Sequence, residues 1–202
     1  MRDKKTDKVI ALYHAVEDFV AEGADLSGMR VGDIAARAGI GKGTTYEYFA
    51  SKEELVVKAM VYLVGTMTKR IINNMEKQDT FHDKFMLLLE EMEEKVKQRA
   101  CILKYFHMLG DLNLCEQMQR LLLVSDEAAK ANPMRIIRYL LEEGRKEGII
   151  GGDYSQSYME TVMFSKVIGF VVYVDNVFGN KDCENDVMKQ NIYSGLCREL
   201  GA

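Results

Sequence analysis

Apolar side chains recur at helical spacing along most of the chain. Between residues 8 and 20, Val9, Leu12, Val16 and Val20 fall three or four positions apart, so they share one face of a helix. The same periodicity predicts further helices over residues 31–38, 41–49, 52–74, 80–96, 101–109, 114–131, 134–146, 155–178 and 184–200. The chain is therefore predicted to be all-α.

Glycine and capping residues divide these helices. Gly23 and Gly39 follow the first and second helices, and glycine commonly ends a helix. Ser51 and Glu54 form an S-x-x-E capping box that opens the long fourth helix. Three helices thus precede a larger helical region. We predict an N-terminal three-helix domain over residues 1–50 and a larger helical domain over residues 51–202.

The composition is that of an ordinary folded protein, with 48% hydrophobic and 29% charged residues among 202. The longest strongly apolar stretch, residues 167–174, is far shorter than the roughly eighteen residues that cross a bilayer. The charged residues 1–8 lead into an amphipathic helix without the apolar segment of an export signal. We expect no membrane span and a cytoplasmic location.

Residues with catalytic or metal-binding chemistry are scattered along the chain. The four cysteines lack the C-x-x-C spacing of zinc and redox sites: Cys101, Cys115, Cys183 and Cys197. The glycines between Gly39 and Thr44 superficially match a phosphate-binding loop. However, Ala36 stands where its first glycine is needed, and Gly43 replaces the required hydroxyl residue. We predict no catalytic residue, metal or cofactor, and we expect that the protein is not an enzyme.

The two short helices over residues 31–38 and 41–49 carry the most informative pattern. A glycine-containing turn between two such helices is typical of a helix-turn-helix, whose second helix enters the major groove of DNA. Gly39 makes the turn, and Ala35 and Ile40 offer apolar contacts between the helices. Phe49 and Leu55 are predicted to anchor the second helix to the fourth.

The charge of this region does not by itself indicate DNA binding. Residues 1–60 hold nine lysines and arginines against ten aspartates and glutamates, whereas nucleic-acid binders usually have a basic surface. Helix N-termini present N–H groups to phosphates, and the hydroxyls of Thr44, Tyr46 and Tyr48 add donors. A few lysines therefore suffice, and the acidic remainder of the chain favours binding at specific sites.

The stretch from Asp33 to Leu55, DIAARAGIGKGTTYEYFASKEEL, resembles the signature of the TetR/AcrR family of transcriptional regulators. The order, the spacing and the capping box agree together over about residues 6–55. The resemblance implies that the protein binds double-stranded operator DNA. It assigns the DNA contacts to Arg30, Gly41, Lys42, Gly43, Thr44, Thr45, Tyr46, Tyr48 and Lys52.

The sequence departs from the family pattern in three places. Gly41 stands where the family usually has a serine, so the second helix of the motif lacks a capping hydroxyl there. Thr45 replaces a larger apolar residue, which predicts looser packing by about 1 kcal/mol. Met29 and Arg30 stand where a serine or threonine usually precedes the first helix of the motif, and Arg30 offers a charged contact instead.

For the second domain, the resemblance implies a homodimer and a small-molecule effector. Aromatic side chains are candidates for lining an effector pocket, the alternative being an ordinary helical core: Phe85, Tyr105, Phe106, Tyr139 and Phe164. Small and apolar residues on the last two helices are candidates for the dimer interface: Val162, Ser165, Gly169, Val172, Ile192 and Gly195.

These inferences predict a ligand-responsive repressor that an apolar or amphipathic molecule releases from its operator. Two alternatives stay open. One is a helix-turn-helix regulator that responds to a protein partner or acts without an inducer. The other is an all-helical enzyme or carrier with a degenerate helix-turn-helix.

Overall fold

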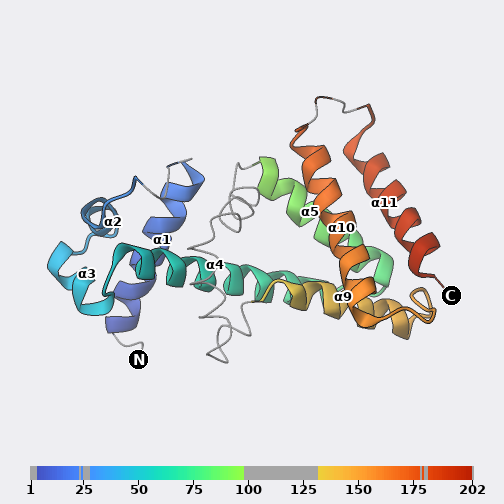
Figure 1. Cartoon of the computed structure of the whole chain (residues 1–202), viewed down its shortest axis with the longest axis horizontal. Helices are drawn as coiled ribbons and strands as arrows, with labels where there is room; N and C mark the ends of the chain where they lie inside the picture. The colour runs from blue at the N-terminus through green and yellow to red at the C-terminus, as the bar shows by residue number, and fades with distance from the viewer. Residues whose placement is uncertain are drawn as a thin grey trace. The chain divides into compact units, whose positions relative to one another are not determined.

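The computed structural model describes residues 4–22, 24, 28–97, 132–177, 179 and 182–201. Every regular element within these ranges is an α-helix, which confirms the predicted fold class. In chain order the helices are α1 (Lys4–Ala21), α2 (Val31–Arg37), α3 (Lys42–Tyr48), α4 (Lys52–Met75), α5 (Phe81–Lys97), α9 (Met134–Lys146), α10 (Gln156–Val174) and α11 (Asn185–Leu200) (Figure 1). The helices predicted over residues 101–109 and 114–131 lie outside the described residues.

The helices form two compact units that divide inside α4. The first unit holds the described residues up to Met67, together with Asn132. The second begins at Thr68 and includes the described residues from Pro133 onward. The domain boundary that the sequence predicts, between residues 50 and 51, stays a prediction.

The first unit is built around an apolar core shared by α1, α2 and the start of α4. Leu12 and Val16 of α1, Ile34 of α2 and Leu55 of α4 are fully buried in it. Phe49, the residue after α3, is buried in the same core, so the chain that leaves α3 is anchored. Burying each such side chain stabilises the fold by about 1.5–3 kcal/mol.

The second unit packs α5, α9, α10 and α11 against one another. Helix α10 contacts the other three, and α5 also contacts α9 and α11 (Figure 1). The rings of Phe81 and Phe85 on α5 lie 6.2 Å apart, and Tyr193 of α11 lies 5.9 Å from each of them. Leu140 of α9 and Phe170 of α10 are also fully buried. The core of this unit is therefore aromatic and aliphatic.

Helix α10 differs from its neighbours because it is apolar around most of its circumference. By length and composition alone, it is the one described helix that could cross a membrane. The core helix of a globular protein meets the same criterion, and α10 contacts three other helices. Only 33% of its apolar window is buried within this chain. Apolar residues of α10 that are only half-buried therefore keep part of their surface accessible: Phe164, Ile168, Val172 and Val174.

Candidate nucleic-acid interface

The turn between α2 and α3 is closed by backbone hydrogen bonds. The Gly39 amide donates to the carbonyl of Ala36 at 3.1 Å, and the Ile40 amide donates to that of Ala35 at 2.8 Å. Gly39 has a φ of +67°, a left-handed conformation that favours glycine and commonly follows the end of a helix. The sequence-predicted role of Gly39 is confirmed by this geometry.

The inner side of α3 is closed to solvent. Thr45 is only 1% exposed, and its hydroxyl donates to the Gly41 carbonyl at 3.4 Å. The side chain of Thr45 therefore faces the core, where the family pattern has an apolar residue. Its hydroxyl is already hydrogen-bonded within the helix. The buried Thr45 side chain is therefore not available for the DNA contact that the sequence predicts.

The outer side of α3 presents polar side chains to solvent. Lys42, Gly43, Tyr46 and Glu47 are exposed, whereas Thr44 and Tyr48 are half-buried. Tyr46 is 50% exposed, so its ring and hydroxyl are open to solvent. The predicted contact residues of α3, apart from Thr45, therefore lie on an accessible face. Sequence reasoning missed Glu47 on this face.

Two further predicted contacts lie where α2 and α3 begin. Arg30 is the residue before α2 and is exposed, and its side chain makes no capping hydrogen bond. Gly41 holds the corresponding place before α3, also without a side-chain cap. The arginine on α2, Arg37, is engaged elsewhere: its Nη1 lies 2.7 Å from Glu22 Oε1 and its guanidinium lies 3.9 Å from the Phe19 ring centre.

The start of α4 is fixed by the predicted capping residues. The Glu54 amide donates to Ser51 Oγ at 3.1 Å, and Glu54 Oε2 accepts from the Ala50 amide at 2.6 Å. The hydrogen bond from Lys58 lowers the pKa of Glu54, so its carboxylate stays charged. Lys52, at the head of this helix, keeps 23% of its side chain exposed, and its Nζ lies 3.7 Å from Glu53 Oε1.

Three of the predicted effector residues lie in the second unit. Phe85 is fully buried and packs against Phe81 and Tyr193, while Tyr139 and Phe164 are half-buried. Tyr105 and Phe106 lie outside the described residues. The predicted pocket thus stays a prediction.

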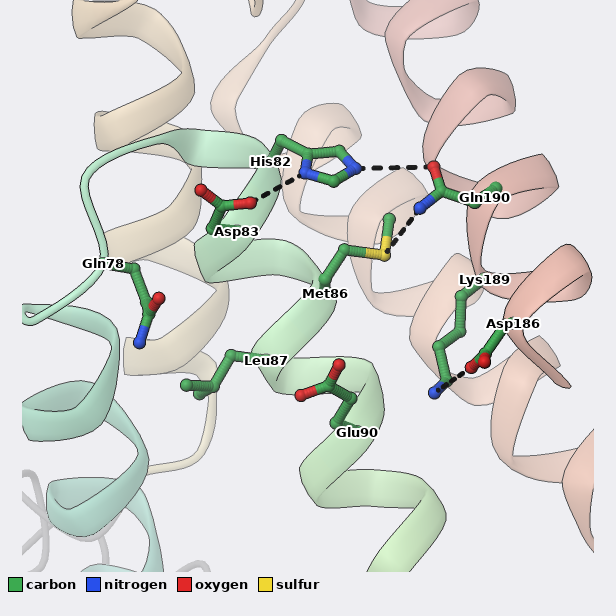
Figure 2. A pocket seen from close by; sticks show the side chains of 9 residues that line it. All are labelled: Gln78, His82, Asp83, Met86, Leu87, Glu90, Asp186, Lys189 and Gln190. Carbon is green, nitrogen blue, oxygen red and sulfur yellow. Dashed lines mark hydrogen bonds and ion pairs between the residues drawn. The ribbon is translucent and has the colours of Figure 1, made fainter.

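A groove of about 500 Å³ lies between α5 and α11. Its lining, shown in Figure 2, is Gln78, His82, Asp83, Met86, Leu87, Glu90, Asp186, Lys189 and Gln190. None of the five predicted effector residues is among them. His82 Nδ1 lies 3.0 Å from Asp83 Oδ1, and its Nε2 lies 3.4 Å from Gln190 Oε1 (Figure 2). The groove is polar, unlike the apolar pocket that the sequence predicts.

The predicted dimer residues fall into two groups. Val162 is buried inside its own unit. Ser165 and Gly169 are exposed, and the remaining three are half-buried: Val172, Ile192 and Gly195. A Cβ atom added at Gly169 or Gly195 would meet nothing within 4 Å. These five positions therefore remain accessible to a partner, whereas Val162 does not.

Across the described ranges, no group of three or more His, Cys, Asp and Glu side chains could hold a metal ion. The two cysteines of these ranges, Cys183 and Cys197, are free and half-buried. The exposed polar side chains of the first unit, such as Arg30, Lys42 and Tyr46, can form hydrogen bonds and ion pairs with a bound molecule. A short, exposed polar helix held on a buried anchor behind a tight turn defines a helix-turn-helix DNA-binding protein.

Comparison with known proteins agrees with this class. Residues 15–59 match the model of the bacterial regulatory proteins of the tetR family, a range that includes all of α2 and α3. No curated protein shows significant sequence similarity to the chain. The helix-turn-helix region of this chain is thus similar to that of the tetR family of bacterial regulatory proteins.

Solved structures of similar fold cover nearly the whole chain. The regulator FadR from Bacillus subtilis, in complex with stearoyl-CoA, shares 18% identity over 93% of this chain and 96% of that one, with a TM-score of 0.68. The fatty acid degradation regulator FadR from Bacillus halodurans shares 19% identity over 98% and 96%, with a TM-score of 0.65. A TetR-family regulator from Marinobacter aquaeolei shares 19% over 97% of each chain, with a TM-score of 0.62.

Proposed function

We propose that the protein is a homodimeric, ligand-responsive repressor of the cytoplasm without enzymatic activity. The observation that carries the proposal is the exposed polar face of α3, which is held above a buried anchor at Thr45 and Phe49. The proposed contact set is Arg30, Gly41, Lys42, Gly43, Thr44, Tyr46, Tyr48 and Lys52. Lysines and hydroxyls of this kind bind phosphates and fix the register of a protein on DNA.

Dimerisation is supported by the apolar surface of α10. That helix is apolar around most of its circumference but is only 33% buried over its apolar window. Covering such a surface with a second copy removes it from water, at about 25 cal/mol per Å². Ser165 and Gly169 lie four residues apart on the exposed side, so another helix can approach closely there. Helices α10 and α11 of two copies would form a four-helix interface.

The dimer is required because one seven-residue recognition helix reads few base pairs. Two recognition helices about 34–36 Å apart read successive major grooves on one face of DNA. A change in their separation therefore controls affinity for an operator.

We place the effector in the second unit, and α4 is the element through which it would act. That helix belongs to both units, because the division between them falls between Met67 and Thr68. Thr68 is fully buried, and within the described part of the chain its hydroxyl has no hydrogen-bond partner. A buried hydroxyl without a partner costs about 1–3 kcal/mol, which a polar group of a bound molecule would recover. The FadR of similar fold holds stearoyl-CoA, a molecule with both apolar and polar parts.

An effector releases DNA only if it binds the two arrangements of the protein with different affinity. A coupling of about 1–3 kcal/mol weakens operator binding roughly five- to 150-fold. Operator DNA must weaken effector binding by the same factor, because coupling between two binding sites is reciprocal.

Two measurements test the proposal. In a gel shift, the protein should retard the DNA that flanks its own gene at concentrations that leave scrambled DNA of equal length free. Once a molecule that raises the melting temperature is known, its dissociation constant should rise by the coupling factor when operator DNA is saturating. Equal dissociation constants with and without DNA would refute the inducer mechanism. A regulator driven by a protein partner would show DNA binding but no response to small molecules.

A further inference from the structure

The side chain that points most directly away from the buried side of α3 is an acid. Successive residues of an α-helix are rotated by about 100°, so a residue two positions from Thr45 points about 200° away from it. Thr45 is the buried residue of α3, and the two positions opposite to it are Gly43 and Glu47. Both are exposed. Gly43 has no side chain, so Glu47 provides the one side chain at the centre of the outer face.

Glu47 is also chemically available. Among the described residues, no hydrogen bond or ion pair engages its carboxylate. The glutamates near it are occupied: Glu54 accepts from Lys58 and from the Ala50 amide, and Glu53 lies beside Lys52. A Cβ at Gly43 would meet nothing within 4 Å, so the outer face is open one helical turn before Glu47, which is itself exposed.

DNA offers few groups that can bind a carboxylate. The phosphates repel it, so Glu47 cannot be one of the backbone contacts that dominate affinity. In the major groove the exposed hydrogen-bond donors are the amino groups of bases, and a glutamate accepts characteristically from cytosine N4. An acid at the centre of a recognition helix is therefore placed where it can read a base.

We propose that Glu47 determines operator sequence by accepting a hydrogen bond from the N4 amino group of one cytosine in each half-site. The inference rests on the DNA-binding function and adds the base that this helix selects. Repulsion between the carboxylate and the phosphates also disfavours registers in which α3 lies against the backbone, so non-specific binding is weakened.

In vitro selection from a library of duplexes with a random central stretch tests this proposal. The wild-type protein, Glu47→Ala and Glu47→Gln should be selected in parallel, with Glu17→Gln as the control. Glu17 is an exposed acid of α1, outside α2 and α3, and it pairs with His14. All these positions are exposed, so melting temperatures should agree and differences will report on DNA.

The wild type and Glu17→Gln should enrich sites with cytosine at one position of each half-site. Glu47→Ala should lose the preference at that position alone, and the preference for the cytosine site over its thymine variant should fall by about tenfold per half-site. Glu47→Gln should favour adenine there, because an amide pairs with adenine N6 and N7.

Enrichment of identical sites by all four proteins would overturn the assignment of Glu47 while leaving the DNA-binding function intact. Tighter binding of Glu47→Ala to every sequence, with unchanged base preference, would also overturn it, because it would make Glu47 a source of repulsion only. If the wild type enriches no site, the function and the inference fail together.

Discussion

Lys189 Nζ lies 2.7 Å from Glu93 Oε2, with only 8% and 11% of the two side chains exposed. The pair joins α11 to α5 in the second unit. Lys97 Nζ lies 2.7 Å from the other carboxylate oxygen, and Asn185 Nδ2 donates to that same oxygen at 2.8 Å. The buried carboxylate of Glu93 is thus paired with lysines of both α5 and α11 and accepts a further hydrogen bond from α11. Such a network fixes the register in which α11 packs on α5.

Replacing Glu93 by glutamine should destabilise the protein by about 3 kcal/mol. The substitution removes the buried carboxylate that faces the Lys189 ammonium and leaves the exposed Asp186 as its remaining acidic partner, which compensates a buried charge poorly. The free energy of unfolding from urea denaturation at neutral pH measures this loss. As a control, Asp186→Asn removes the other partner of Lys189, whose side chain is 91% exposed, and should cost less than about 1 kcal/mol. Equal losses for the two variants would contradict the assigned role of Glu93.

The same pair makes stability depend on pH in a defined window. Burial acts to raise the pKa of Glu93, but hydrogen bonds from Lys189, Lys97 and Asn185 outweigh it and lower the pKa from 4.5 to about 2. A lowered pKa in the folded state contributes stability above pH 4.5, and that contribution is lost as the pH falls toward 2. The difference in unfolding free energy between wild type and Glu93→Gln should therefore shrink below pH 4.5. A difference in unfolding free energy that stays constant from pH 7 to pH 3 would show that this network does not lower the pKa of Glu93.

Tyr46→Phe and Lys52→Ala should each weaken operator binding without lowering the melting temperature by more than a degree or two. Both side chains reach solvent, and both are proposed to contact phosphates. Loss of Lys52 should also reduce the slope of log affinity against log salt by about one unit, because one fewer counterion is released. The exposed residues Lys69 and Tyr154 provide matched controls, as Lys69→Ala and Tyr154→Phe. Unchanged binding at several salt concentrations would remove Tyr46 and Lys52 from the interface.

Gly169→Arg should convert the proposed dimer to a monomer. A Cβ at this position meets nothing within 4 Å, so the substitution does not disturb the fold of its own chain. A large charged side chain on the exposed face of α10 would, however, be buried without a partner in the interface. Sedimentation at micromolar concentration measures the change, and circular dichroism verifies the helical content. A variant that remains dimeric, or a wild type that is monomeric, would place the interface elsewhere.

Gly144→Ala should destabilise the second unit by about 1–3 kcal/mol. Gly144 lies inside α9, and an added Cβ would come closer than 3.0 Å to Ile150 Cγ1 and within 3.2 Å of Phe81. Gly32 of α2 has only an ordinary contact at 4.0 Å, so Gly32→Ala should raise stability by about 0.5–1 kcal/mol. Thermal unfolding of both variants tests the contrast. Two shifts of the same sign would contradict the close packing described for α9.

Much of the helical framework was determined by the sequence alone, because its signals are local. The apolar period and the capping residues predicted a helix over residues 134–146 and another over 52–74, and the structure has Met134–Lys146 and Lys52–Met75. The turn at Gly39 was readable for the same reason: a left-handed residue after a helix nearly demands glycine. The predicted helix ends were less accurate where the sequence has no strong capping residue. Helix α1 begins at Lys4 and not at residue 8, and α10 ends at Val174 and not at residue 178.

For α3 and α10, only the tertiary structure decided which residues meet the core. Thr45 and Glu47 are both polar residues of one short helix, yet Thr45 is buried and Glu47 is exposed. Val162 and Gly169 likewise share α10, but Val162 faces its own chain. The ion pair of Glu93 with Lys189 joins residues far apart in the sequence. Such pairings depend on how helices from distant parts of the chain pack, and no local periodicity encodes that arrangement.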